Sequence, residues 1–185
     1  MRIIAGIAKG RRLVAPDGMQ TRPTQDKTRE ALFSMIQAYV PEACVLDLFG
    51  GTGALALEAM SRSASKAVIC DISRPAQKAI ETNIKAVLGE TDTVALIKAD
   101  YRVALKQLDG QSFDLVFLDP PYADELAYLN SLSFILEHDM LSDGALVIVE
   151  KRKDFNIRYP EGFKIIKSRN YSDTTIELLT KEETL

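Results

Sequence analysis

Short apolar runs alternate with longer amphipathic segments along most of this chain. Runs of about four to eight apolar residues bounded by turn residues are typical of buried strands, whereas apolar positions repeated every three or four residues are typical of helices. The helical repeat is clearest at Ala76, Ala79, Ile80, Asn83, Ile84 and Val87. The alternation predicts an α/β fold, with a doubly wound, mostly parallel sheet covered by helices on both faces.

The same pattern gives the order of elements. Strands are expected at 44–49, 66–71, 93–98, 113–118 and 145–150, with a closing antiparallel hairpin at 163–171 and 174–179. One helix is expected to begin at a Thr24 or Asp26 cap and to end at 38, and another to begin at a Ser73 cap and to contain the repeat from Ala76 to Val87. Further helices are expected at 54–60, 103–108 and 124–137. Near the amino end, two short strand-like runs, 3–7 and 11–14, lie on either side of Lys9-Gly10, and this arrangement predicts a short β-hairpin. Residues 1–40 are therefore expected to extend a single compact domain at 41–185.

Composition and charge narrow the class of protein. The chain has 185 residues, 46% hydrophobic and 26% charged, which is ordinary for a globular protein. No apolar run approaches the roughly 18 residues of a membrane span, and the first residues lack a signal-peptide core, so we expect a cytoplasmic protein. Cys44, Cys70 and His138 are too few for a usual zinc site, and buried reduced thiols are expected instead.

Basic residues are concentrated at the amino end. Residues 1–29 carry seven Lys or Arg and two acids, a balance of +5, which leaves −8 for the rest of a chain whose net charge is −3. Such asymmetry favours a basic extension that contacts phosphates on an acidic body. An exposed hairpin whose charges only keep it soluble would look the same.

Asp119-Pro120-Pro121-Tyr122 is the most informative motif. It follows the buried run 113–118, and two consecutive prolines prevent the chain from continuing as a strand or starting a helix. Open α/β sheets bind their ligands at the carboxyl ends of strands. An acidic acceptor, a carbonyl and an aromatic ring held rigidly there suit a planar base with an exocyclic amine. The alternative is a proline turn with a core tyrosine.

A glycine turn forms the second motif. Gly50-Gly51-Thr52-Gly53 lies between the strand that contains Asp47 and a segment of high helix propensity, and Gly51, Gly53 and Ala56 satisfy G-x-G-x-x-A. Strand, glycine turn and helix form a nucleotide-binding arrangement, since the helix start presents free N–H groups. The turn alone also fits a nicotinamide-dependent oxidoreductase.

Together the two motifs resemble S-adenosylmethionine-dependent amino-methyltransferases. The amino end, with Arg2-Ile3-Ile4-Ala5-Gly6, Lys9-Gly10-Arg11, Thr21-Arg22-Pro23-Thr24 and Arg29-Glu30-Ala31-Leu32-Phe33, resembles the bacterial 16S ribosomal RNA (guanine(966)-N(2))-methyltransferase family. The resemblance implies a Rossmann-like fold and S-adenosyl-L-methionine as cofactor. It also implies 16S ribosomal RNA or an assembling small subunit as partner, with no metal.

Acidic residues at successive strand ends agree with this cofactor. Asp71 is placed to accept from ribose hydroxyls, and Asp100 from the adenine amine beside Tyr101, although Asp100 could equally cap a helix. The family often has Glu at position 71 and Asp at position 73, so Ser73 leaves its ribose role open. The expected cofactor-binding residues are Asp47, Phe49, Gly50, Gly51, Thr52, Gly53, Asp71, Ile72, Asp100 and Tyr101.

The expected chemistry is direct methyl transfer to the N2 amine of guanine. Asp119 and the Pro120 carbonyl would bind the two amine N–H groups, and Tyr122 would stack on the base; with Pro121 these are the expected catalytic residues. The RNA would be unpaired or flipped out, and we expect a monomer. The expected RNA-binding residues are Lys9, Arg11, Arg12, Arg22, Thr24 and Arg29.

The sequence also allows other functions. The same amine-binding motif would serve an N-methyltransferase acting on another RNA, on a protein glutamine or on a small molecule. A non-catalytic RNA-binding module that keeps the fold is a third class.

Overall fold

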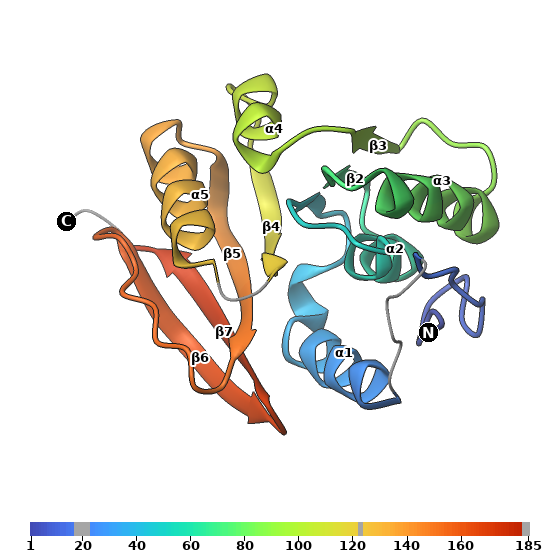
Figure 1. Cartoon of the computed structure of the whole chain (residues 1–185), viewed down its shortest axis with the longest axis horizontal. Coiled ribbons are helices and arrows are strands. Elements are labelled where there is room, and N and C mark those ends of the chain that lie inside the picture. Colours follow the sequence, from blue (N-terminus) through green and yellow to red (C-terminus); the bar gives the residue numbers. More distant parts are fainter. Residues whose placement is uncertain (17–22, 122–123, 183–185) are drawn as a thin grey trace.

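A seven-stranded sheet runs through the centre of the molecule (Figure 1). The computed structural model describes residues 1–16, 23–121 and 124–182. The elements along the chain are α1 (Pro23–Met35), η1 (Gln37–Tyr39), β1 (Cys44–Asp47), α2 (Ala54–Ser61), β2 (Lys66–Cys70), α3 (Arg74–Leu88), β3 (Val94–Ile97), α4 (Tyr101–Gln107), β4 (Phe113–Leu118), α5 (Glu125–Glu137), β5 (Leu141–Arg152), β6 (Phe163–Tyr171) and β7 (Thr174–Lys181).

The strand order is β3-β2-β1-β4-β5-β7-β6. The first five strands are parallel, and β7 pairs antiparallel with both β5 and β6. This confirms the predicted doubly wound sheet with a C-terminal antiparallel hairpin. The chain moves outward in opposite directions from β1 and from β4, so the order reverses between these two neighbours. Ligands in open α/β sheets bind at such a reversal.

Two apolar layers hold the helices on the sheet. On one face, Leu32 and Phe33 of α1 pack with side chains of α2 and α3 and with alternate strand residues such as Phe117 and Ile148. On the other face, α4 and α5 cover the intervening strand residues. The two faces follow from the period-2 alternation of side chains along each strand.

Several boundaries differ from the sequence-based expectation for local reasons. The amino-terminal hairpin is one bridge, Arg2 to Arg12, rather than two strands. Helix α1 begins at Pro23, so Thr24 and Asp26 lie inside its first turn instead of capping it. Ser73 is the N-cap of α3, but its side chain makes no capping bond; its N–H donates to Asp71 instead.

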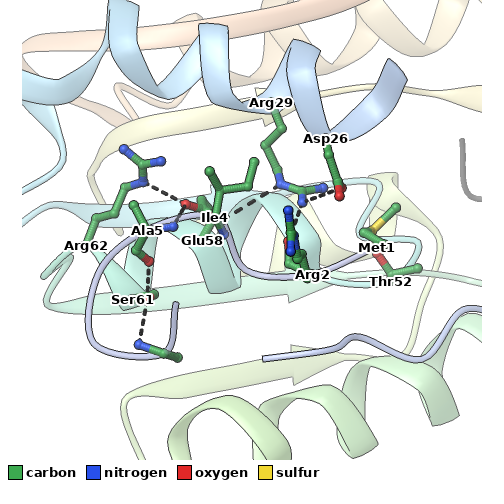
Figure 2. A network of polar contacts seen from close by, with 11 residues as sticks. Met1, Arg2, Ile4, Ala5, Asp26, Arg29, Thr52, Glu58, Ser61 and Arg62 are labelled. Carbon is green, nitrogen blue, oxygen red and sulfur yellow. Dashed lines mark hydrogen bonds and ion pairs between the residues drawn. The ribbon is translucent and has the colours of Figure 1, made fainter. Parts of the chain in front are cut away.

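The amino-terminal segment is anchored on α2 by a buried acid (Figure 2). Glu58, fully buried in α2, accepts from the backbone N–H groups of Ile4 at 2.7 Å and Ala5 at 3.0 Å. Arg62, one turn later, pairs with the same carboxylate at 2.7 Å. The segment is thus bound to the central sheet through α2, with these polar backbone groups satisfied in the interior.

Candidate active site

A cleft of about 1490 Å³ opens along the carboxyl ends of the parallel strands. The residues that follow β1 and β4 both line it, because these strands pair directly: Asp47 is in register with Phe117, and Leu48 N–H donates to Phe117 O at 3.3 Å. The glycine turn and the Asp119-Pro120-Pro121 corner therefore leave the sheet side by side. The volume exceeds the roughly 300–1,000 Å³ of a usual small-molecule pocket.

The glycine turn is shaped by left-handed backbone and by close packing. Gly51 and Gly53 have φ of 57° and 74°. A Cβ on Gly50 would lie 2.4 Å from Cγ2 of Ile69, so only glycine fits there. Thr52 is buried behind the turn, where its hydroxyl donates to the sulfur of Met1 and its carbonyl accepts from Asn83.

Asp71 holds the turn and still faces the cleft. One carboxylate oxygen accepts from Gly51 N–H at 2.8 Å and the other from Ser73 N–H at 2.7 Å. Each oxygen retains acceptor capacity, since a carboxylate has about four lone-pair sites. Ile72, beside it, is 67% exposed and also lines the cleft. Both residues, which the sequence analysis expected to bind the cofactor, lie on the wall of the cleft.

Asp100 serves as a helix cap at the next strand end. Its carboxylate accepts from the backbone N–H of Arg102 at 3.0 Å and from Nε of the same residue at 2.7 Å. These bonds to Arg102 lower the pKa of Asp100 below its ordinary value. The following ring, Tyr101, packs against Phe49 with centroids 5.4 Å apart. The capping alternative for Asp100 is thus correct, and the residue lines the cleft as well.

Three carboxylates lie on the same side of the sheet: one at the end of β1, one directly after β4 and one within β5. They are Asp47, Asp119 and Glu150. The residue two positions before each of them belongs to the apolar layer beneath α1, so all three acids are on that face of the sheet. Burial raises the pKa of Asp47 to about 7, partly offset by the N–H of Phe49. Such elevation is typical of grouped carboxylates away from bulk water.

Asp119 differs from Asp47 in its access to solvent. Its side chain is open to the cleft, yet the protein packed around it desolvates the charge. This enclosure, followed by the negative charges of Glu150 and Asp47, raises the pKa of Asp119 well above its usual range. Pro120 is buried and Pro121 exposed, and both line the cleft. Tyr122 lies outside the described residues.

The expected RNA-binding residues fall into two places. Lys9, Arg11 and Arg12 are exposed and line a separate shallow hollow of about 490 Å³. Arg29 is only 5% exposed; its guanidinium donates to Arg2 O at 2.5 Å and Asp26 at 2.9 Å, and its Nε lies 3.8 Å from Glu58 (Figure 2). It lines the main cleft. Arg22 lies outside the described residues, and Thr24 is placed only as part of α1.

The sequence analysis missed Glu150 and Glu58 as site-forming residues. Glu150 ends an apolar run, 145–149, as Asp119 does, and that position is the signal that was available. Glu58 gives no such signal, because its partners lie more than 50 positions away in the chain. Within the described ranges, no three His, Cys, Asp or Glu are arranged to hold a metal ion. Nor is any helix there long and apolar enough to cross a bilayer.

Comparison with known proteins identifies the family of the chain. The family model described as Conserved hypothetical protein 95 matches residues 1–180. The chain belongs to this family. It is 33% identical to Ribosomal RNA small subunit methyltransferase D of Haemophilus influenzae, over 91% of this chain and 88% of that protein. The resemblance expected from the sequence is therefore confirmed.

Solved structures share the whole architecture. That of yhhF from Escherichia coli aligns with a TM-score of 0.86 at 26% identity, covering 100% of this chain and 99% of that one. The structure of SMU.776 complexed with SAH shares the fold, with a TM-score of 0.68 at 16% identity over 88% of this chain and 51% of that one. The Rossmann-like methyltransferase fold is thus common to all three chains.

Proposed function

We propose that this protein transfers a methyl group from S-adenosyl-L-methionine to the exocyclic N2 amine of a guanine in 16S ribosomal RNA. The observation that carries the proposal is the adjacency of the glycine turn and the Asp119-Pro120-Pro121 corner at the reversal between β1 and β4. A donor on the first and an acceptor on the second would meet within one cleft. The kinship with an rRNA methyltransferase supports the substrate class.

The residues around the glycine turn suit this cofactor. Gly50 and Gly51 line the cleft without side chains and so allow a ligand to approach the backbone closely, Asp71 offers acceptors for ribose hydroxyls, and Ile72 and Tyr101 offer apolar faces for a base. When bound, S-adenosyl-L-methionine supplies an electrophilic methyl group. Asp47, buried beneath the turn with its pKa raised to about 7, would place an ionisable carboxyl group near that cationic donor.

The proline corner suits the amine. The lone pair of a guanine amine is delocalised into the ring, so the nitrogen is a poor nucleophile. The Asp119 carboxylate and the Pro120 carbonyl would accept its two N–H groups, favour a pyramidal nitrogen and stabilise the positive charge that develops on it. Tyr122 would stack on the base. Since the amine must reach the cleft, the nucleotide enters unpaired or flipped out of a helix.

The rest of the chain suits an RNA substrate. Exposed Lys9, Arg11 and Arg12 form a basic surface on residues 1–40, the extension of the methyltransferase domain at 41–185. Arg22, Thr24 and Arg29 would line the path between that surface and the cleft. One chain builds the complete cleft, so a monomer suffices. Because ribosomal RNA lies in the bacterial cytoplasm, the enzyme would act there.

Replacing Asp119 by Ala tests the proposal directly. Removal of one charge-matched acceptor should lower the methylation rate about a hundredfold, or roughly 3 kcal/mol in transition-state stabilisation. The assay uses labelled cofactor and ribosomal RNA from a strain that lacks the modification, followed by mapping of the modified base. Calorimetry with S-adenosylhomocysteine should show unchanged affinity. Unchanged methylation by the variant, or modification of a protein amide instead of RNA, would contradict the proposal.

A further inference from the structure

Asp119, Glu150 and Asp173 line the cleft, and none of their carboxylates has an internal partner within the described chain; the first lies directly after β4 and the second on the neighbouring strand β5. Asp71 accepts from Gly51, Asp100 from Arg102, and Asp124 caps α5 by accepting from Ala127. By contrast, no hydrogen bond or ion pair within the described residues involves the carboxylate of Asp119 or that of Glu150. Unpartnered acceptors in a cleft are available to a ligand.

Strand register places these two acids next to each other. Leu118 of β4 pairs with Val149 of β5, so the next residues, Asp119 and Glu150, continue neighbouring strands. The preceding alternate residues, Phe117 and Ile148, belong to the same apolar layer. Side chains two positions apart share a face, so both carboxylates lie on the side of the sheet that α1 covers. They form a pair of acceptors rather than two separate sites.

The backbone of Glu150 is hydrogen-bonded on both sides, whereas its carboxylate has no hydrogen bond within the described residues. Its carbonyl accepts from the Tyr128 hydroxyl at 2.6 Å, and the residue pairs with Ile176 of β7. The charged groups that act on its carboxylate are Asp119, Asp173 in the β6–β7 turn, and Arg29 of α1. The guanidinium of Arg29 donates to Asp26 and to Arg2 O, so it offsets the charge of Glu150 without a hydrogen bond to it.

The ring atom beside the amine distinguishes the bases. In guanine the exocyclic amine is next to N1–H, a donor. In adenine and cytosine the ring nitrogen next to the amine carries a lone pair and accepts. A second carboxylate beside Asp119 therefore attracts the edge of guanine and repels the corresponding edge of adenine or cytosine.

We propose that the Glu150 carboxylate accepts a hydrogen bond from N1–H of the target guanine while Asp119 and the Pro120 carbonyl hold the amine, so that Glu150 selects guanine. This inference rests on the proposed function and deepens it by naming a residue that determines the base. Burial raises the pKa of Glu150, and Asp173 adds to the shift while Arg29 opposes it. A second N–H donor from the base relieves the like-charge repulsion between the two acids.

A base analogue tests the contact. We would compare an RNA substrate that contains the mapped target guanine with the same RNA carrying 2,6-diaminopurine there, which keeps the amine but has a lone pair at N1. The wild-type enzyme should prefer guanine by about 10- to 100-fold in kcat/KM. In Glu150→Gln the amide donates to that lone pair, so the preference should shrink by about 10-fold. In Glu150→Ala the rate on guanine should fall by about 10- to 100-fold, with little change on the analogue.

Matched measurements separate a base contact from a general effect of charge. Asp173→Asn removes the other acid that faces Glu150 and should leave the guanine preference unchanged. Affinity for S-adenosylhomocysteine should be the same in all variants, and a cooperative melting curve confirms folding. A guanine preference equal to wild type in both Glu150 variants would overturn the inference. Failure of the wild-type enzyme to methylate the guanine RNA would instead refute the proposed function.

Discussion

Acids at different strand ends of the sheet differ in pKa because their surroundings differ. Asp100 is held by Arg102, and its pKa is lowered. Asp47 is 2% exposed and lies close to Asp71, and its pKa is raised to about 7. A site that binds a cationic donor and later a neutral product can use carboxylates of both kinds. The raised pKa of Asp47 also makes the stability of the protein depend on pH.

Replacing Asp47 by Asn should change that dependence. The folded protein holds the Asp47 proton more tightly than the unfolded chain, so the stabilisation is complete below pH 4 and is lost as pH rises toward 7. Asn keeps the shape but does not ionise. The free energy of unfolding of Asp47→Asn, relative to wild type, should rise by about 3 kcal/mol between pH 5 and pH 8. Urea denaturation at both pH values measures it; an equal difference at both would show that Asp47 titrates normally.

The bounds of an element could be predicted from the sequence where they depend only on residues close to it in the chain. Strand β4 and hairpin strand β6 have the expected bounds, since turn residues and apolar alternation act over a few positions. The pairing of Asp71 with Gly51, or of Glu58 with Ile4, could not be predicted, because each joins distant segments. Position at strand ends predicted the candidate site residues, whereas their hydrogen-bond partners became known only from the structure.

The amino-terminal segment illustrates this limit. Sequence indicated a basic hairpin, but the structure shows a segment bound to α2, with Ile7 N–H donating to Ser61 O and Ala8 N–H to the Ser61 hydroxyl. Its first residue reaches Thr52 behind the glycine turn (Figure 2). Met1 and Pro16 of the segment line the main cleft, so the segment forms part of its wall and also carries positive charge.

Gly6 should be required for this docking. A Cβ at Gly6 would lie 1.7 Å from the backbone oxygen of Ser61, and φ is +82°. Gly10 has nearly the same φ, +84°, but nothing within 4 Å, so it is a matched control. Gly10→Ala should lower the free energy of unfolding by about 1 kcal/mol from backbone strain alone. Gly6→Ala should lower it by about 2–4 kcal/mol and weaken binding of S-adenosylhomocysteine, because the segment must leave α2.

Thermal unfolding and calorimetry on the two variants decide the matter. Equal destabilisation by both substitutions would show that backbone conformation, and not contact with Ser61, limits the segment. Loss of stability in Gly6→Ala with full cofactor affinity would show that the segment is not part of the cofactor cleft.

On the scale of the whole molecule, the exposed basic residues of the amino-terminal segment lie apart from the acids of the main cleft. The basic hollow at Lys9, Arg11 and Arg12 lies beside α2 and α3, whereas the edge strand β6 is at the far side of the sheet (Figure 1). The main cleft, lined by several acids, lies along the strand ends between them. An acidic cleft repels phosphates but binds a cationic donor and an amine. Under the proposed function, we therefore expect the basic extension to supply the phosphate contacts, with only the target base entering the cleft.

This division predicts the salt dependence of RNA binding. Changing Lys9, Arg11 and Arg12 together to Ala should weaken binding of small-subunit ribosomal RNA and reduce the slope of log K against log salt by about 2 to 3, since each phosphate contact contributes about 0.7–0.9. Cofactor affinity and melting temperature should stay the same, because these side chains are exposed and apart from the cleft.

The control changes Lys164, Lys167 and Arg169 of β6, which alters net charge equally at the opposite edge. An equal loss of slope in both triple variants would mean that the overall field, and not the amino-terminal surface, holds the RNA. A loss confined to the Lys9, Arg11 and Arg12 variant would locate the phosphate contacts on the amino-terminal segment, which Glu58 holds on α2. Because the same segment lines the main cleft, RNA binding and the proposed cofactor site would then depend on one element.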